Sequence, residues 1–537
     1  MLELNGKSLA QKDAWNAVNV TLPQFAWDAM VKATKEHPMW VHFGAGNIFR
    51  GFIARLQQEL LNQGLSDRGI IAADTFDYDI IDKIYTPFDN MTMMVSLNPD
   101  GTTSREIVAS IAEGLRADSS DVSQMARLAE IFTDASLQMV SFTITEKGYA
   151  LANMAGELLP VVRADIQEGP DHARHAMSMV TALVHKRYLA GGAPLALVSM
   201  DNCSHNGEKL MNSVLTVAKA WLEKGFVEQG FIDYLTDESK ISFPWSMIDK
   251  ITPRPAKVVE DSLEADGIAN MAPIVTSKNT FIAPFVNAER PEYLVVEDKF
   301  PAGRPPLEKA GVYMTDRETV NKTERMKVTT CLNPLHTALA VYGCMLGHTL
   351  ICEEMKDEDL VKLVRTLGYQ EGLPVVVDPK ILSPKAFIDE VVEQRLPNPF
   401  MPDAPQRIAT DTSQKVGIRF GETIKSYLAA GKDLNQLTAL PLALAGWLRY
   451  LLAVDDEGKP MECSADPMKD ELQQKLAGIK VGDPASYQGQ LRPILANEVI
   501  FGTDLVKAGL ADKIETLFVE ELAGPGAVRA TLKKHLA

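Results

Sequence analysis

The chain has 537 residues, which exceeds one compact domain and predicts two or three. Its apolar content of 46% and charged content of 23% are ordinary for a globular protein. The formal net charge of −17 argues against nucleic acid or an anionic membrane as a partner. Five scattered cysteines without CxxC or zinc-type spacing indicate a reduced, cytoplasmic protein without a metal site.

Residues 1–37 are a polar lead-in with one short predicted helix. An apolar run then ends in Gly44-Ala45-Gly46, and a helical pattern follows from Ile48. A strand, a glycine turn and a helix are typical of dinucleotide sites, because glycines let the backbone approach a pyrophosphate and the helix N-terminus provides N–H groups. Phe49 stands where a third glycine is usual, so a plain turn without a ligand stays an alternative.

A second predicted strand ends in Asp74, 28 residues after Gly46. This spacing is slightly longer than usual for the acid that binds an adenosine ribose hydroxyl. We expect Asp74 beside the ribose, where its charge would repel a 2′-phosphate and favour NAD over NADP.

Apolar runs alternate with helical patterns from residue 38 to residue 305. This alternation predicts an α/β domain with a Rossmann-like, doubly wound, mainly parallel sheet. The segment 98–103 is typical of a hairpin turn, which predicts an antiparallel addition. Predicted strands are 70–73, 139–144 and 195–199, and predicted helices are 122–134 and 172–190.

Polar clusters follow two of these strands, at the edge where ligands bind in open α/β sheets. The first contains Thr145, Glu146 and Lys147, which we expect near the cofactor, although a capped loop would use the same residues. The second contains Asn202, for which an Asx-rich turn is an equal alternative. Asp249 is a further candidate for sugar hydroxyls, and a surface ion pair is the commoner role for the acid and base of its segment.

A Pro/Gly-rich break lies at 300–306, and helical patterns dominate after it. Residues 306–537 are therefore expected to form a mainly α-helical second domain. The most apolar pattern, 437–454, is interrupted by Arg449 and is too short to span a bilayer comfortably. The predicted helices are 337–349, 357–367, 383–394, 437–454 and 469–480.

The segment 324–336 contains Lys327, Asn333 and His336. A lysine in a dry site can have its pKa lowered enough to act as a general base, and an amide donor can polarise a carbonyl. Asn333 and His336 are three residues apart and share a helix face. A solvated lysine, a helix-capping asparagine and a satisfied interior histidine are the alternative.

Arg395 and Lys415 are two further candidates in the second half. Arginine can hold a carboxylate through two parallel hydrogen bonds. A structural arginine at a helix end is the alternative for Arg395.

Seven motifs in register resemble one enzyme family. They are Gly-Ala-Gly-Asn-Ile-Phe-Arg-Gly-Phe, Thr-Ile-Thr-Glu-Lys-Gly-Tyr, Asp-Asn-x-x-x-Asn-Gly, Asp-Lys-Ile-Thr-Pro, Lys with Asn-x-x-His, Arg-x-x-Asn-Pro and Ala-Gly-Trp-Leu-Arg-Tyr. Over residues 38 to 530 the sequence resembles the long-chain, polyol-specific dehydrogenases, the mannitol dehydrogenase family, which includes mannitol 2-dehydrogenases and fructuronate (mannonate) reductases. Its length and N-terminal segment resemble the D-mannonate oxidoreductase branch, whose members are longer.

The resemblance implies roles for individual residues. Lys327 matches the family's catalytic lysine, and Asn202 and Asn333 match two carbonyl-polarising asparagines. His336 matches a substrate-binding histidine, and Asp249 matches a sugar-binding acid.

The resemblance also implies a proton relay and a cofactor. Glu324 matches a glutamate associated with proton exchange to solvent. The implied cofactor is NAD, with no metal. The candidate cofactor-binding residues are Gly44, Gly46, Asn47, Ile48, Arg50, Asp74, Thr145, Glu146 and Lys147.

The sequence differs from the family pattern at one point. Five residues, Val328 to Leu332, separate Lys327 from Asn333, where the family usually has four. On a regular helix this extra residue rotates the lysine by about 100° relative to the asparagine. We therefore predict a bulge or an irregular helix start between them.

The resemblance thus implies a cytoplasmic NAD-dependent oxidoreductase that interconverts D-fructuronate and D-mannonate, with Lys327 as general acid and base. A substrate carboxylate would need local positive groups in so acidic a protein, and Arg395 and Lys415 are the candidates. Alternatives are a mannitol or arabinitol 2-dehydrogenase, a tagaturonate/altronate oxidoreductase, and a nucleotide-binding sensor that only the irregular lysine spacing favours. The expected partner is a small sugar acid or polyol, and the oligomeric state stays open.

Overall fold

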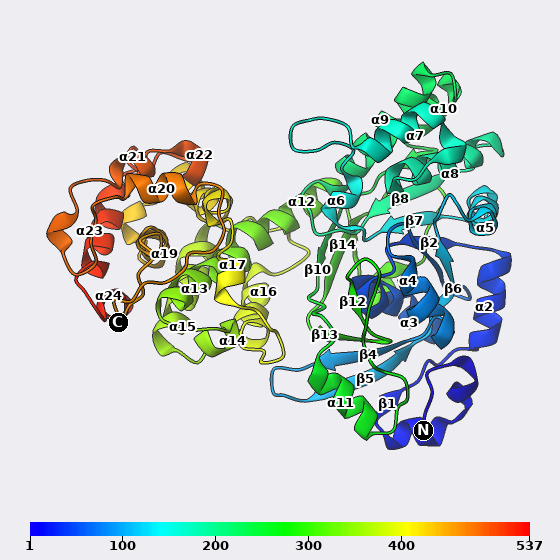
Figure 1. The fold of residues 1–537 in the computed structure, drawn as a ribbon, viewed down its shortest axis with the longest axis horizontal. Helices are drawn as coiled ribbons and strands as arrows, with labels where there is room; N and C mark the ends of the chain where they lie inside the picture. The colour runs from blue at the N-terminus through cyan, green and yellow to red at the C-terminus, as the bar shows by residue number, and fades with distance from the viewer. The chain divides into compact units, whose positions relative to one another are not determined.

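The computed structural model describes all residues, 1–537, and divides into two compact units. Unit 1 comprises Met1–Leu97 and Thr102–Asn321, and unit 2 comprises Lys322–Ala537 with the short segment Asn98–Gly101. Unit 1 is an α/β body, and unit 2 is built mainly of helices (Figure 1).

The centre of unit 1 is a six-stranded parallel sheet with the order β6-β3-β2-β7-β8-β9. The polypeptide starts this sheet in the middle at β2, adds β3 and β6 on one side and then β7, β8 and β9 on the other. This is the doubly wound order, so the predicted Rossmann-like sheet is confirmed. The strands are β2 (Trp40–Phe43), β3 (Ile70–Asp74), β6 (Ile111–Arg116), β7 (Met139–Phe142), β8 (Leu195–Ser199) and β9 (Ile241–Ser242).

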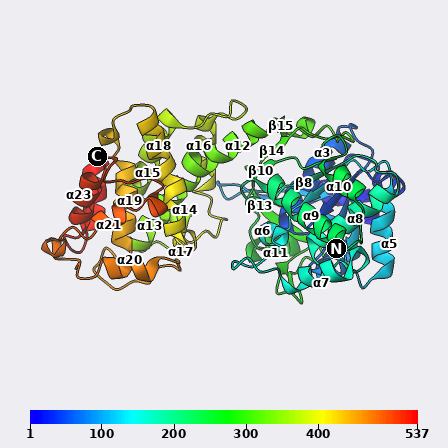
Figure 2. The same cartoon turned by 90° about the horizontal axis from the view of Figure 1, so that it is seen from above.

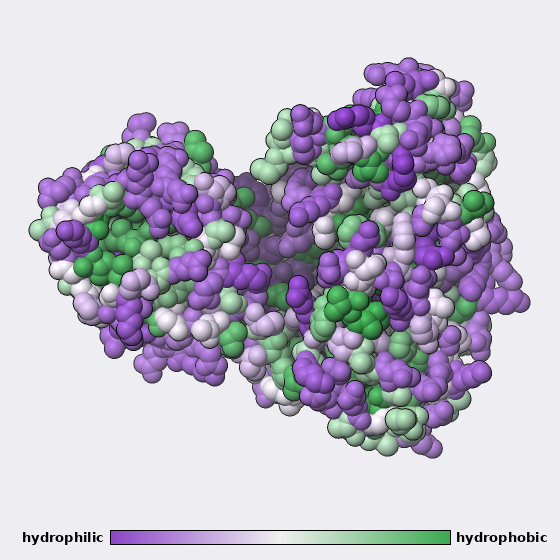
Figure 3. Space-filling model, in the orientation of Figure 1, coloured by the Kyte–Doolittle hydropathy of each residue, from purple (hydrophilic) through white to green (hydrophobic).

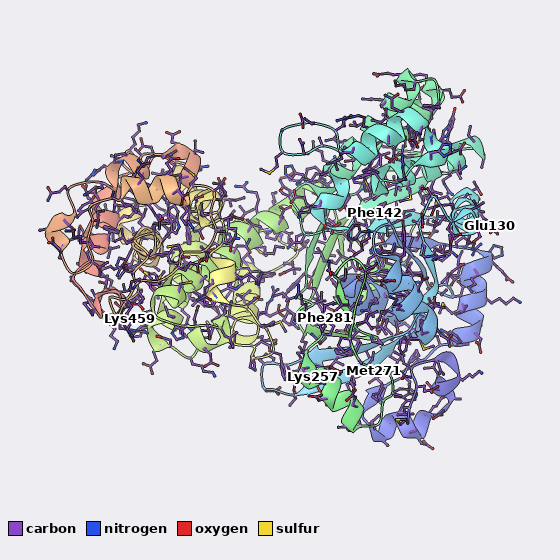
Figure 4. The ribbon with its side chains drawn as sticks, viewed as in Figure 1. Glu130, Phe142, Lys257, Met271, Phe281 and Lys459 are labelled. Atoms are coloured by element: carbon purple, nitrogen blue, oxygen red, sulfur yellow. The ribbon has the colours of Figure 1, made fainter.

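Two hydrophobic cores lie on the two faces of this sheet. Val41 and Phe43 of β2 join one core and Trp40 joins the other, as the two-residue period of a strand requires. The ring of Phe142 in β7, labelled in Figure 4, stacks on Phe43 with the ring centroids 5.5 Å apart. Helices α5 (Val122–Thr133), α8 (Ala176–Leu189) and α9 (Asn206–Glu223) contribute to the first core, and η2 (Phe49–Ile53) and α3 (Ala54–Asn62) contribute to the second.

Three smaller sheets complete unit 1. Strands β4 and β5 pair antiparallel, which confirms the addition predicted at 98–103, and the N-terminal segment joins through β1, which pairs with β5. The orders are β1-β5-β4-β13, β10-β14-β15 and β11-β12. The bounds are β1 (Val20–Thr21), β4 (Thr92–Leu97), β5 (Thr103–Val108), β10 (Ser246–Asp249), β11 (Ile274–Val275), β12 (Phe281–Ile282), β13 (Phe285–Glu289), β14 (Tyr293–Glu297) and β15 (Tyr313–Thr315).

Unit 2 is organised around α19 (Ala439–Tyr450), whose residues are all buried. It packs against α13 (Asn333–Met345) and α23 (Ala511–Glu521), and α13 and α19 lie side by side in both views (Figure 2). None of the helices has the length and apolarity that crossing a membrane requires. Further helices are α12 (Arg317–Met326), α14 (Ile351–Glu354), α15 (Glu358–Arg365), α16 (Pro384–Glu390), α17 (Pro405–Ile408), α18 (Glu422–Ala429), α20 (Lys469–Lys475) and α24 (Ala527–His535).

Several helices contain π-helical turns, in which one extra residue is inserted into the helix. Such turns occur often at functional sites. In unit 2, Lys327 begins one of them and Arg395 ends another. The π-helical turns are η2 (Phe49–Ile53), η3 (Ile81–Tyr85), η7 (Lys327–Cys331), η8 (Thr366–Gly372), η10 (Val391–Arg395) and η12 (Gly417–Gly421).

Candidate active site

Gly44 and Gly46 lie in the turn between β2 and the helical segment that begins at Asn47. Gly44 has a φ of +104°, and a Cβ there would stand 2.1 Å from the carbonyl oxygen of Thr143. A Cβ on Gly46 would meet no atom within 4 Å, so the space beside it is open. Only glycine can therefore occupy position 44, and the space beside Gly46 at the start of the helix can admit a pyrophosphate.

Phe49, at the position of the missing third glycine, is fully buried and stacks on His42 with ring centroids 4.0 Å apart. Gly51 provides close packing instead, because a Cβ there would stand 2.7 Å from Val286 Cγ1. Ile48, beside Phe49, is partly buried. The helix after the glycine turn therefore packs closely two residues later than the usual pattern predicts.

Asp74 ends β3 and is 7% exposed. One carboxylate oxygen accepts the N–H of Ala45 at 3.0 Å, and the other accepts the N–H groups of Phe76 and Asp77, each at 2.8 Å. Burial raises the pKa of Asp74, and these three bonds oppose the shift. A carboxylate has about four acceptor directions, so Asp74 can tie the two loops together and still accept a hydroxyl.

Arg50, expected at the cofactor, is 1% exposed. Its guanidinium donates to the carbonyl oxygen of Ala283 and to Asn47 Oδ1, each at 2.9 Å. Burial lowers its pKa to about 10. In this position Arg50 supports the glycine turn through Asn47.

An apolar patch on unit 1 lies over the β11–β12 hairpin (Figure 3). Phe281 of β12, labelled in Figure 4, and its cross-strand partner Val275 are 37% and 62% exposed. The hydroxyl of Thr276 donates to Asp77 Oδ2 at 2.6 Å and ties the hairpin to the loop that follows Asp74. Apolar surface is therefore available next to the loop that contains Asp77.

Asp201, one residue before Asn202, connects the ends of β7 and β8. Its carboxylate accepts the N–H groups of Ile144 and Thr145, each at 2.9 Å, and the hydroxyl of Tyr149 at 2.6 Å. These bonds hold Thr145 in a left-handed conformation, with φ +63°. The sequence placed Asp201 in the motif Asp-Asn-x-x-x-Asn-Gly, but only Asn202 was assigned a role. An acid two residues after a buried strand was the available signal for Asp201.

The other unit 1 candidates lie close to strand ends. Asn202, Glu146 and Lys147 are exposed, and Glu146 forms an ion pair with Lys209 of α9. Asp249 ends β10 and is 7% exposed.

Helix α12 begins in unit 1 and ends in unit 2, where it passes directly into the π-helical turn η7 at Lys327. Leu332 interrupts the helix before α13 begins at Asn333. This turn accommodates the extra residue, so the predicted bulge is confirmed. Lys327 is 2% exposed, and Glu324, one turn earlier, is partly buried. The N-cap of α13 is Leu332, so the capping role considered for Asn333 is wrong.

His336 lies on α13, one turn after Asn333. Its Nε2 is 3.6 Å from Asp403 Oδ2, beyond hydrogen-bond distance, and this buried nitrogen has no partner. Burial lowers the pKa of His336 to about 4. Asp403 opposes this shift, whereas the nearby arginines 419, 407 and 395 add to it. The imidazole is therefore neutral near pH 7 and able to bond a hydroxyl.

Arg419 in η12 is a member of this cluster that sequence reasoning missed. It donates to Thr337 Oγ1 at 2.5 Å, and Thr337 donates to the carbonyl oxygen of Asn333 at 2.8 Å. Lys415 precedes Arg419 by one turn, and its carbonyl oxygen accepts the Arg419 N–H at 2.9 Å. The four-residue spacing from Lys415 to Arg419 was the available signal.

The structure thus gathers part of the expected site within unit 2. Turn η7, which begins with Lys327, packs against η12 and α13. Arg395 at the end of η10 is 5% exposed and lies close enough to His336 to lower its pKa. Burial lowers the pKa of Lys415, and Arg419 adds to this shift. No group of three or more His, Cys, Asp or Glu side chains is arranged to hold a metal ion.

Comparisons with known proteins agree with this architecture. The model of the mannitol dehydrogenase Rossmann domain matches residues 38–309, and that of the mannitol dehydrogenase C-terminal domain matches residues 319–520. The chain is 51% identical to D-mannonate oxidoreductase of Thermotoga maritima over 99% of each chain. It is 30% identical to mannitol 2-dehydrogenase of Phaeosphaeria nodorum, over 88% of this chain and 77% of the relative.

A solved structure is similar over the full length. It is the mannitol 2-dehydrogenase of Pseudomonas fluorescens in a ternary complex with NAD and D-mannitol, with a TM-score of 0.69, 25% identity and coverage of 99% of each chain. The Rossmann sheet, the helical unit and these matches define a dehydrogenase that acts on a CH–OH group. The chain belongs to the mannitol dehydrogenase family.

Proposed function

We propose that this dehydrogenase interconverts D-fructuronate and D-mannonate with NAD as its cofactor. The observation that carries the proposal is the pair of arginines near His336, Arg395 and Arg419, with Lys415 next to Arg419, in a protein of net charge −17. Such a group suits a substrate with a carboxylate, which a polyol lacks. The 51% identity to a D-mannonate oxidoreductase supports the same substrate.

The glycine turn fits the cofactor. Gly44, Gly46 and the helical segment from Asn47 would hold the pyrophosphate, and Asp74 would accept a ribose hydroxyl. When bound, the nicotinamide supplies or accepts the hydride. The remaining candidates for contacts with the cofactor are Ile48, Thr145, Glu146 and Lys147, whereas Arg50 acts through Asn47.

The protein's own contribution is to hold the carbonyl and to move a proton. The amide groups of Asn202 and Asn333 bind the oxygen at C5 of the keto acid and stabilise its developing charge. The ammonium group of Lys327 donates a proton to this oxygen, and in the reverse direction the neutral amine removes it from the alcohol.

Three further residues complete the proposed reaction. His336 and Asp249 bind sugar hydroxyls, and Glu324 exchanges the proton of Lys327 with solvent. The extra residue before Asn333 needs no other explanation, because η7 accommodates it. The irregular spacing therefore no longer favours a sensor without turnover.

A direct assay tests the substrate. NADH oxidation is followed spectrophotometrically with fructuronate, tagaturonate and fructose, and kcat/KM is compared. The highest value with fructuronate supports the proposal. Preference for fructose would replace it with a polyol 2-dehydrogenase, as in the relative from Phaeosphaeria nodorum, and preference for tagaturonate with the altronate reaction.

A further inference from the structure

Arg419 is a partly buried cation for which the protein provides no counter-ion. Its side chain makes one hydrogen bond, to Thr337, and no carboxylate lies within ion-pair distance of it. Burial lowers the pKa of Arg419 to about 10, and no acid opposes this shift. A desolvated charge is costly and is normally paired, so an arginine in this state is suited to an anionic ligand.

The acids close to the neighbours of Arg419 do not act on Arg419 itself: Asp403 lies near His336, and Asp411 and Asp466 lie near Lys415. Asp403 forms an ion pair with Arg407. Asp466 accepts the N–H and the hydroxyl of Ser413. The positive charge of Arg419 is therefore left uncompensated beside α13, the helix that carries Asn333 and His336.

We propose that Arg419 binds the carboxylate of the sugar acid through its planar guanidinium, with Lys415 as a second cation one turn away. The proposal rests on the proposed function, since it requires a substrate with a carboxylate. The bond from Arg419 to Thr337 holds the guanidinium at α13, and Thr337 directly follows His336 in that helix. The acid end of the substrate would then lie beside the hydroxyl that His336 binds.

The position of Arg419 also agrees with the other reactive segments of unit 2. It lies in a π-helical turn, as Lys327 and Arg395 do, and η12 packs directly against η7. Arginine is better suited than lysine to this task, because its two parallel N–H groups match the two oxygens of a carboxylate.

The first test is a change of substrate preference. Arg419→Gln should lower kcat/KM for fructuronate at least about 30-fold, the typical effect of losing a charged hydrogen bond, and change the value for fructose less than about threefold. Arg492→Gln is the matched control, because it removes an arginine of α21 (Arg492–Leu495) that is paired with Asp512 and Glu515. It should leave both values unchanged.

The second test measures binding without turnover. With NAD present, D-mannonate should raise the Tm of the wild-type protein more than D-mannitol does, and Arg419→Gln should abolish this difference. The ligand-free Tm of the variant should not fall, because a partly buried charge without a counter-ion is removed. If Arg419→Gln does not fold, Arg419→Lys replaces it and should retain part of the preference for the acid.

The outcomes separate the two proposals. A wild-type enzyme that prefers fructose removes the sugar-acid function itself. A wild-type enzyme that prefers fructuronate, with the same preference in Arg419→Gln or an equal loss on both substrates, overturns only the role of Arg419.

Discussion

The glycine turn of unit 1 and the η7–α13 junction of unit 2 share one local feature, a π-helical turn, but the polar groups around it have different roles. In each, a π-helical turn carries a buried basic residue, Arg50 in η2 and Lys327 in η7. At the glycine turn the polar groups hold backbone: Arg50 bonds Ala283, and Asp74 accepts three N–H groups. The polar groups of unit 1 therefore form a scaffold.

At the junction of unit 2 the balance is different. The Nε2 of His336 is buried without a partner, and Arg419 has no counter-ion. Arg50 and Arg419 both have their pKa lowered to about 10 by burial, but only Arg50 also bonds a backbone carbonyl. The two arginines have similar pKa values but different hydrogen-bond partners. The comparison therefore indicates that the partners of a buried arginine distinguish a structural role from a ligand-binding role better than its burial does.

The largest expected effect is on the chemistry of unit 2. Lys327→Ala should lower kcat by at least about a thousandfold, because it removes the general acid, while the Kd for NADH stays the same. Steady-state kinetics and fluorescence titration measure the two quantities. Lys362→Ala, at an exposed position of α15, is the control. Near-normal turnover of Lys327→Ala would assign the proton transfer to another residue.

The next effect is on the scaffold. Arg50→Met should lower the free energy of unfolding by about 3 kcal/mol, because it leaves two hydrogen-bond acceptors, the Ala283 carbonyl and the Asn47 side chain, without their buried donor. Urea unfolding measures this loss. A variant of normal stability that no longer binds NADH would place Arg50 in direct contact with the cofactor and break the comparison.

Arg395 tests the comparison within unit 2. Arg395→Ala should weaken fructuronate turnover at least about tenfold, equivalent to roughly 1.4 kcal/mol, if it helps to bind the substrate carboxylate. The measurement is kcat/KM with fructuronate and with fructose. An equal loss on both substrates would give Arg395 a structural or hydroxyl-binding role and leave the carboxylate to Arg419.

Asp74 should affect cofactor choice more modestly. The wild-type enzyme should prefer NADH to NADPH. Asp74→Ala should lower the ratio of kcat/KM with NADH to kcat/KM with NADPH about fivefold, because it removes a negative charge near the 2′ position of the ribose. Asp74→Asn retains an oxygen acceptor for the N–H groups of the loop and separates the charge effect from loss of structure. A wild-type preference for NADPH would show that this placement of Asp74 is wrong.

Several strands of the central sheet were predictable from patterns that are local in sequence. The run 195–199 is bounded by turn or polar residues and matches β8 at both ends. Strands such as β9 and β12 have only two residues, too few for a pattern, and they depend on pairing with β8 and β11. Such strands form because of tertiary contacts, so sequence alone did not predict them.

The candidate site likewise contains features that the sequence predicts and features that it does not. The bulge after Lys327 was predictable because a helix turns by a fixed angle per residue, so one extra residue requires a defect. The supporting role of Arg50 was not predictable, because its hydrogen-bond acceptor Ala283 lies 233 residues away in the sequence. Arg419 was missed because its significance is the lack of a counter-ion in the folded structure, which a sequence pattern does not show.

Glu354 tests whether an unpartnered buried group always marks the site. It is fully buried in α14, and neither carboxylate oxygen has a hydrogen-bond partner. Burial, with a smaller contribution from Asp357, raises its pKa to about 9. Since its folded-state pKa is above the unfolded value, Glu354 contributes stability that is present at low pH and is lost as pH rises toward that value.

The replacement Glu354→Gln keeps the shape and cannot ionise. The free energy of unfolding of the wild type should therefore fall more steeply between about pH 6 and about pH 9 than that of the variant, as measured by urea unfolding at each pH. Turnover of the variant should be unchanged, because Glu354 packs against Gly343 in the interior of unit 2. Equal slopes would show that Glu354 does not titrate in this range. A large loss of turnover would make Glu354 part of the catalytic machinery. The lack of a hydrogen-bond partner would then indicate a functional residue at Glu354, as it does at His336.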